Sequence, residues 1–178
     1  MSNQEKRIEI LTKLELRNVL QRLTTEILEE IDEPKNTILM GIPTRGVYLS
    51  EVLALEIFER IGYDIGKGVI DPTFHRDDQS KFGTKSIKFD SIPSSLDNKE
   101  VILIDDVIYT GRTVRAALEA LNFWGRPKKI MLLTLIDRGH RELPIQPDFY
   151  GKKVITNKDQ KILLRLESLD KIEGVFLV

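Results

Sequence analysis

The chain has 178 residues, of which 41% are hydrophobic and 31% are charged, and its formal net charge is −1. This length and composition predict one globular domain over residues 1–178, and the near-neutral charge gives no global sign of nucleic-acid binding. The absence of cysteine excludes disulfides, thiolate metal sites and cysteine nucleophiles. No apolar run reaches membrane-spanning length, and the first residues are polar, so we expect no membrane partner, no secretory signal and a cytoplasmic location.

Helices are predicted at two places in the first third of the chain. Thr12 and Glu15 form a capping-box pattern, and leucine and isoleucine residues at helical spacing follow it. This helix should end near residues 32–34, where Asp and Glu precede a proline. A second helix is expected from about Val47 to Ile61, where Gly62 ends it.

Strands are predicted between and after these helices, and a third helix follows residue 113. The expected strands are 37–40, 68–71, 101–104, 129–136, 153–155, 161–166 and 175–178. Strands that alternate with helices favour an α/β fold with a mostly parallel sheet. Binding sites of such sheets lie outside the carboxyl ends of the strands, so the turns after residues 40, 104 and 136 are the candidate sites.

Residues 101–113 carry the strongest functional pattern, Val-Ile-Leu-Ile-Asp-Asp-Val-Ile-Tyr-Thr-Gly-Arg-Thr. It predicts a buried strand, an acidic pair at its carboxyl end, a tight turn and a helix N-terminus. The first N–H groups of a helix bind anions; Thr110 and Thr113 add hydroxyl donors, and Gly111 allows close approach. Carboxylates beside a phosphate cradle suit a sugar phosphate with free hydroxyls. The alternative is structural, with Asp106 capping a helix.

These thirteen residues resemble the phosphoribosyl-diphosphate (PRPP) motif of type I phosphoribosyltransferases. The resemblance implies a single-domain fold with a central, mostly parallel sheet flanked by helices and a small hood over the base site. It also implies that Asp105 and Asp106 bind the ribose hydroxyls as the catalytic pair, while the turn from Tyr109 binds the 5′-phosphate. The nucleotide-binding residues implied in this run are Asp105, Asp106, Val107, Ile108, Tyr109, Thr110, Gly111, Arg112 and Thr113.

The turn at residues 41–46, Gly-Ile-Pro-Thr-Arg-Gly, again joins a strand to a helix start. Arg45 can grip a phosphate with two parallel hydrogen bonds, although an ordinary loop with a solvated arginine would look the same. The turn is similar to the pyrophosphate-binding loop of the same family. That similarity implies that Thr44 and Arg45 hold pyrophosphate and that a cis peptide bond joins them.

Residues 72–91 are polar and lack periodicity, so they predict either a solvated loop or a mobile lid. A lid would exclude water from a cationic transition state. The resemblance favours the lid. The Arg76-Asp77-Asp78 triplet within this segment fits one branch of the family, the pyrimidine-operon regulators. His75 has no assigned role.

Residues 137–144, Asp-Arg-Gly-His-Arg-Glu-Leu-Pro, form the third turn. They predict either a basic surface loop or a cap over a bound base, whose polar edge needs donors and acceptors. The segment resembles pyrimidine-operon regulators that are also uracil phosphoribosyltransferases, and this implies that Arg138 and Asp137 lie at the base. Tyr109 favours uracil, because hypoxanthine-type relatives carry aspartate there.

The resemblance implies the reaction of uracil with PRPP to give UMP and pyrophosphate, with Mg²⁺ held mainly through PRPP and with no certain protein ligand. It also implies binding of leader mRNA in the presence of UMP or UTP, and a homo-oligomer. Arg22, His140, Arg141 and Lys152 match the basic RNA surface of the branch, while Glu30 and Gln146 replace more basic residues. Four alternatives stay open: solvated charges, an enzyme without RNA binding, a transferase for another base and a PRPP sensor without turnover.

Overall fold

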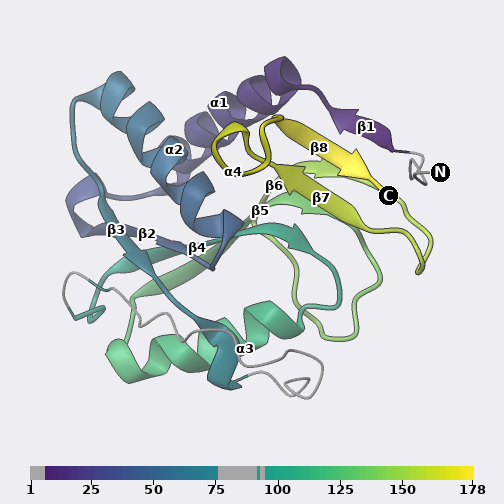
Figure 1. Cartoon of the computed structure of the whole chain (residues 1–178). Helices are drawn as coiled ribbons and strands as arrows, with labels where there is room; N and C mark the ends of the chain where they lie inside the picture. The colour runs from purple at the N-terminus through teal and green to yellow at the C-terminus, as the bar shows by residue number, and fades with distance from the viewer. Residues whose placement is uncertain (1–6, 76–91, 93–94) are drawn as a thin grey trace.

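The computed structural model describes residues 7–75, 92 and 95–178 (Figure 1). Its centre is a five-stranded sheet of order β3-β2-β4-β5-β6, in which each neighbouring pair is parallel. The strands are β2 (Thr37–Gly41), β3 (Gly66–Val69), β4 (Glu100–Ile108), β5 (Lys129–Asp137) and β6 (Phe149–Lys153). The predicted α/β fold with a parallel sheet is confirmed.

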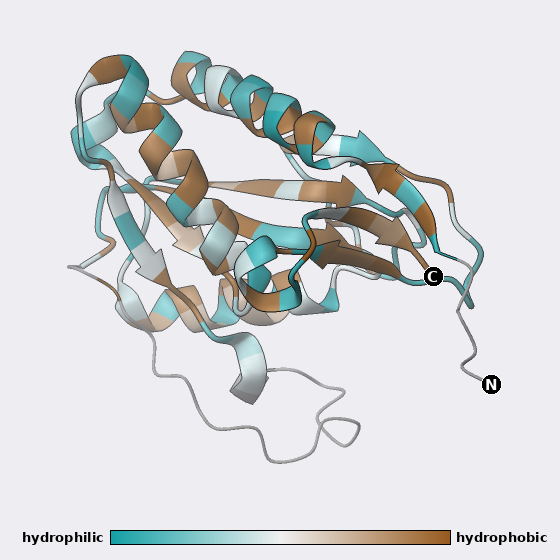
Figure 2. Cartoon of the chain, turned by 45° about the horizontal axis from the view of Figure 1, so that its top comes forward, coloured by the Kyte–Doolittle hydropathy of each residue, from teal (hydrophilic) through white to brown (hydrophobic). Residues whose placement is uncertain are grey.

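Helices cover both faces of this sheet. The first two, α1 (Lys13–Glu30) and α2 (Arg45–Ile61), lie on one face, and α3 (Arg112–Leu121) lies on the other (Figure 1). Successive residues of a strand point to opposite faces, so β4 serves both layers: Ile102 packs in the core under α1 and α2, while Leu103 packs in the core under α3. Figure 2 shows the central strands as largely apolar, as expected for strands covered on both faces.

The predicted capping box at the start of α1 is confirmed. The hydroxyl of Thr12 accepts the backbone N–H of Glu15 at 3.2 Å, and the Glu15 carboxylate accepts the backbone N–H of Thr12 at 2.8 Å. This backbone hydrogen bond lowers the pKa of Glu15 below its ordinary value. α2 also ends as expected, because Gly62 adopts a φ of 68° as its C-cap.

A second, antiparallel sheet of order β1-β8-β7 lies beside the central one. Its strands are β1 (Ile8–Leu11), β7 (Ile162–Arg165) and β8 (Gly174–Leu177), and the short helix α4 (Glu167–Asp170) joins β7 to β8. We call residues 162–177 the hood. The strands at 161–166 and 175–178 were predicted, whereas β1 was not, because it is only four residues long and only Leu11 among them is fully buried.

Two predicted strand positions were wrong, one by two residues and the other by two to four residues. The strand expected at 68–71 is β3 at Gly66–Val69, and the strand expected at 153–155 is β6 at Phe149–Lys153. β6 lies at the edge of the sheet and buries only Phe149 fully, so it lacks the alternating pattern that reveals a half-buried strand. Short 3₁₀ turns occupy Pro34–Asn36, Pro72–His75 and Asn122–Trp124.

Most of the predicted lid, including Arg76, Asp77 and Asp78, lies outside the described residues. Within the part of the chain that the structure describes, no helix combines the length and the apolar character needed to cross a bilayer.

Candidate functional site

The acidic pair lies inside β4 and not after it. The strand was expected to end at residue 104, but it pairs with β5 as far as the Ile108 and Asp137 partners. It continues because β5 runs beside it as a pairing partner: Asp105 pairs with Thr134 and Val107 with Ile136, on either side of Asp106. Asp105 is buried, with 7% of its surface exposed, and Asp106 is partly exposed. The backbone N–H of Asp106 donates to Asp105 Oδ1 at 2.9 Å.

The turn after β4 leads directly into α3. Gly111 is the N-cap of α3, has a φ of 92° and offers no side chain to cap the helix. The hydroxyl of Thr110 accepts the backbone N–H of Arg112 at 3.3 Å, which shapes the turn. A helix N-terminus reached through such a turn suits an anion. Val107 and Ile108, in contrast, pack against the two cores and serve structure.

The loop at the start of α2 lies against the same end of β4. The backbone N–H of Ile42 donates to the carbonyl of Ile104 at 2.9 Å. A Cβ atom on Gly46 would lie 2.3 Å from that same carbonyl oxygen and 3.3 Å from the Cα of Asp105. Only glycine allows this approach, so the turn that holds Thr44 and Arg45 lies beside the acidic pair. The expected cis bond between Thr44 and Arg45 was wrong by one position: it joins Pro43 and Thr44.

The side chain of Arg45 contacts the hood. Its Nε donates to the carbonyl of Leu164, and its Nη2 lies 3.2 Å from Asp170 Oδ2. These two nitrogens form the side-on edge with which arginine usually makes two parallel hydrogen bonds. The edge expected to grip a phosphate is therefore engaged with Asp170 and the Leu164 carbonyl in this structure.

Tyr109 lies between two residues of the third turn. The guanidinium carbon of Arg138 is 3.9 Å from the centre of its ring, and the His140 ring meets it edge-on at 5.7 Å. Arg138 is 8% exposed, and its Nε donates to the hydroxyl of Thr156 at 2.9 Å. His140 Nε2 donates to the carbonyl of Thr156 at 2.7 Å. The structure thus brings the expected base-site residues Tyr109 and Arg138 together. Arg138 and His140, which both contact the Tyr109 ring, are both hydrogen-bonded to Thr156.

Asp137 and Arg141 form an ion pair that shapes this turn. Arg141 Nη2 lies 2.8 Å from Asp137 Oδ1, which also accepts the backbone N–H of Gly139 at 2.9 Å. The other nitrogens of Arg141 donate to the carbonyls of Tyr109 and Ile145, each at 2.9 Å. Both side chains are engaged within the fold, so Asp137 holds the turn and Arg141 presents little free charge.

The other two RNA candidates lie along β6. Arg22 donates from α1 to the carbonyl of Gly151 at 2.6 Å and pairs with Glu26. Lys152 donates to the carbonyl of Ile10 at 3.0 Å. Both side chains are exposed, so their charges face solvent while the bonds join α1 and β1 to the edge strand.

Sequence reasoning missed Glu142, Thr156 and Asp170. Glu142 lies 2.7 Å from the Nε of Arg112 and so joins the third turn to α3. Thr156 and Asp170 contact residues 16 and 125 positions away in the chain. No local pattern marks such partners, because a period or a motif reports only neighbours in sequence.

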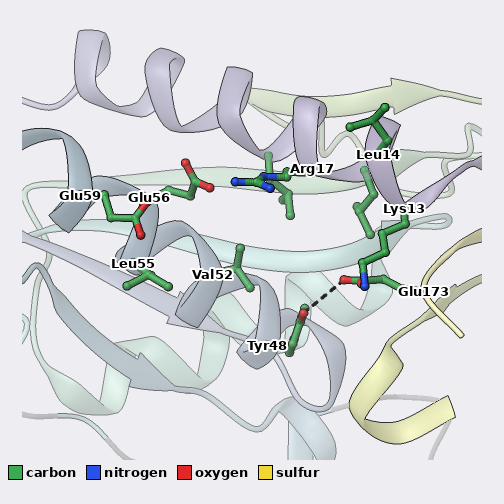
Figure 3. Close-up of a pocket in the computed structure, with 11 residues that line it drawn as sticks. Lys13, Leu14, Arg17, Tyr48, Val52, Leu55, Glu56, Glu59 and Glu173 are labelled. Atoms are coloured by element: carbon green, nitrogen blue, oxygen red, sulfur yellow. Dashed lines mark hydrogen bonds and ion pairs between the residues drawn. The ribbon is translucent and has the colours of Figure 1, made fainter. Parts of the chain in front are cut away.

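A cavity of about 570 Å³ lies between α1 and α2 (Figure 3). Its apolar wall includes Leu14, Val52 and Leu55, and Lys13 at its rim lies 3.0 Å from Glu173. None of the predicted phosphate-binding or base-binding residues lines it.

The candidate metal ligands of the site are the carboxylate oxygens of Asp105 and Asp106. Among the residues that the structure describes, no group of three or more His, Cys, Asp and Glu side chains is placed to hold a metal ion. Asp105 and Asp106 are carboxylates of the type that Mg²⁺ prefers. The residues present therefore fit a Mg²⁺ ion that arrives with a diphosphate and takes most of its ligands from it and from water.

Comparison with known proteins agrees with this geometry. Residues 8–169 match the phosphoribosyl transferase domain family. The "Bifunctional protein PyrR" of Microcystis aeruginosa is 46% identical over 96% of this chain and 97% of its own length. The protein of the same name from Trichormus variabilis is 44% identical over 100% and 99%, and that from Latilactobacillus sakei is 41% identical over 94% and 95%.

Solved structures support the fold. A hypoxanthine phosphoribosyltransferase from Staphylococcus aureus superimposes with a TM-score of 0.68 at 21% identity, over 95% of this chain and 90% of that one. A hypoxanthine-guanine phosphoribosyltransferase from Bacillus anthracis gives a TM-score of 0.70 at 16% identity, over 96% of each. With the family match over residues 8–169, these findings show that the chain belongs to the phosphoribosyl transferase domain family.

Proposed function

We propose that this protein transfers the phosphoribosyl group of PRPP to uracil and releases UMP and pyrophosphate. The observation that carries the proposal is the contact between the start of α2 and strand β4: Gly46 lies against the Ile104 carbonyl, beside Asp105. This contact sets a loop with the pyrophosphate-binding pattern next to the acidic pair and the helix N-terminus that follows it. A diphosphate, a ribose and a 5′-phosphate need these three features side by side.

In the proposed reaction, the bond between ribose C1′ and the diphosphate oxygen breaks and the bond from C1′ to uracil N1 forms. The N1 proton of uracil leaves to solvent. Positive charge develops on the ribose, as in glycosyl transfer, and the carboxylates of Asp105 and Asp106 would hold its hydroxyls and stabilise that charge. Mg²⁺ bound to the diphosphate would neutralise the leaving group. The turn from Tyr109 to Thr113 would anchor the 5′-phosphate.

The choice of uracil rests on the third turn and on the relatives. Residue 109 is a tyrosine, which has no carboxylate for a purine ring nitrogen, and its ring stacks with Arg138. The curated relatives at 41–46% identity carry the name "Bifunctional protein PyrR", in line with a pyrimidine-specific branch.

A panel of bases tests the activity. The purified chain is incubated with PRPP, Mg²⁺ and uracil, cytosine, hypoxanthine, guanine or adenine, and nucleotide and pyrophosphate are both measured. We expect UMP and pyrophosphate in equal amounts from uracil. Turnover of a purine in preference to uracil would assign another base, and PRPP binding without turnover of any base would assign a sensor.

We propose as a second function the binding of pyrimidine-operon leader mRNA in the presence of UMP or UTP. It rests on the similarity to proteins named bifunctional over 96% of the chain and on the exposed cations Arg22 and Lys152. Phosphate contacts dominate RNA affinity and weaken with salt. A gel shift with leader RNA, with and without UMP, tests it, and a double variant Arg22→Gln/Lys152→Gln should weaken the shift. The absence of a shift at low salt would exclude RNA binding and leave only the proposed enzymatic activity. The predicted homo-oligomer is tested by light scattering on the same samples.

A further inference from the structure

The side chains of Arg45, Tyr48 and Lys13 join the hood to the helices on its side of the sheet. Arg45 reaches Asp170 at 3.2 Å and also donates to the Leu164 carbonyl, and Lys13 pairs with Glu167. In addition, the hydroxyl of Tyr48 lies 3.5 Å from Glu173, and Lys13 lies 3.0 Å from Glu173. Figure 3 shows the last two at the edge of the cavity between α1 and α2. Of the three side chains, only Arg45 belongs to the loop proposed to hold the diphosphate.

Asp170 is the centre of this contact. Its Oδ2 accepts the backbone N–H of Leu166 at 3.0 Å as well as Arg45, and its Oδ1 accepts Arg165 Nη1 at 2.6 Å. The carboxylate side chain is only 13% exposed, so water screens these interactions less than it would screen a surface pair. Asp170 is thus held in place by the hood backbone and in turn holds the Arg45 guanidinium.

We propose that Asp170 is a positioning residue, which fixes the guanidinium of Arg45 at the pyrophosphate-binding loop so that its remaining N–H groups meet the diphosphate of PRPP. This inference rests on the proposed function and deepens it. Arg45 uses Nε and one side of Nη2 toward the hood. The protons of Nη1 and the second proton of Nη2 lie outside these two contacts and are the donors assigned to the diphosphate.

The physical gain is preorganisation. A long, mobile arginine loses rotamer freedom when it binds, and this loss of entropy opposes binding. Asp170 orders Arg45 before the ligand arrives, so the cost is met on folding. Removing the carboxylate should therefore weaken diphosphate binding by about three- to tenfold. If the carboxylate merely competed with the diphosphate for Arg45, its removal would strengthen diphosphate binding instead.

Calorimetry on the full chain separates these cases. Pyrophosphate, PRPP and UMP, each with Mg²⁺, are titrated into the wild-type protein and into Asp170→Asn, which keeps the shape of the side chain. We expect weaker binding of pyrophosphate and PRPP by about three- to tenfold and unchanged binding of UMP, which has a 5′-phosphate but no diphosphate. Glu173→Gln is the matched control, because it alters the Tyr48 and Lys13 links of the same hood segment and leaves Arg45 untouched; it should leave all three affinities unchanged.

A double-mutant cycle provides the second test. Arg45→Lys keeps the charge but cannot make both hood contacts, and it should weaken pyrophosphate binding and raise the KM for PRPP. Combined with Asp170→Asn it should add little, because the two changes remove one interaction. Equal or tighter pyrophosphate binding by Asp170→Asn, equal losses for UMP and pyrophosphate, or additive losses in the cycle would overturn the inference. Failure of the wild-type protein to bind PRPP would instead overturn the proposed function itself.

Discussion

The guanidinium of Arg138 stacks on the ring of Tyr109, with its carbon 3.9 Å from the ring centre. The same guanidinium donates to Thr156 at 2.9 Å, so one arginine joins the turn after β4 to the segment after β6. This stack orders the residues proposed to bind the base. The contributions of the Tyr109 ring and of the Tyr109 hydroxyl can be tested separately.

We expect Tyr109→Ala to lower the free energy of unfolding by about 1–2 kcal/mol, the range of a cation–π contact that is partly shielded from water. It should also lower kcat/KM for uracil. Tyr109→Phe keeps the ring and should stay close to wild type in both. Urea unfolding and initial rates measure the two effects, and a Phe variant as impaired as the Ala variant would assign the role to the hydroxyl.

We expect Asp106→Asn to reduce kcat roughly a hundredfold, in the range found when one group that stabilises transition-state charge is removed. UMP affinity should change far less, because the ground-state nucleotide carries no developing charge on its ribose. Single-turnover rates and UMP titration give the two numbers. The matched control is Asp64→Asn, whose side chain is 79% exposed. Equal losses of turnover and UMP affinity would contradict a transition-state role.

We expect Gly46→Ala to destabilise the fold by about 2–3 kcal/mol, since the new methyl group would overlap the Ile104 carbonyl and force the start of α2 away from β4. PRPP affinity should fall with it. Gly62→Ala is the control, because its Cβ meets nothing within 4 Å and only the positive φ is strained, at a cost of about 1 kcal/mol. Thermal unfolding of both variants measures the difference. A Gly46→Ala protein no less stable than Gly62→Ala would show that the contact between the start of α2 and β4 is loose.

The hood should lose stability in acid through Asp170. The backbone N–H of Leu166, then Arg165, and then the charge of Arg45 lower the pKa of Asp170 below its ordinary value. A carboxyl group with a lower pKa in the folded state contributes stability above its unfolded pKa of about 3.9 and loses it as the pH falls through the folded pKa. The difference in unfolding free energy between wild type and Asp170→Asn should therefore be full at pH 7 and shrink below about pH 4. Urea titrations across this range measure it, and a constant difference would mean that the carboxylate charge is not involved.

Much of this molecule could be predicted from short stretches of sequence. The capping box at Thr12, the C-cap at Gly62 and the strand-turn-helix from Val101 were all visible, because each depends on residues within a few positions of one another. Continuous apolar runs likewise revealed the central strands, because a strand that is buried on both faces is apolar at successive positions. The edge strands β1 and β6 were missed or misplaced because their exposed residues carry no such pattern.

The sequence alone determined the chemistry on offer: two adjacent carboxylates, a glycine turn before a helix, and an arginine in a glycine-bounded loop. Only the tertiary structure decided how that chemistry is held. It extended β4 through both acids, paired Asp137 with Arg141, and set Arg45 against a carboxylate 125 residues away. The physical reason is that hydrogen bonds and ion pairs depend on distance in space, which the topology of the two sheets creates, and no local pattern of residue types reports it.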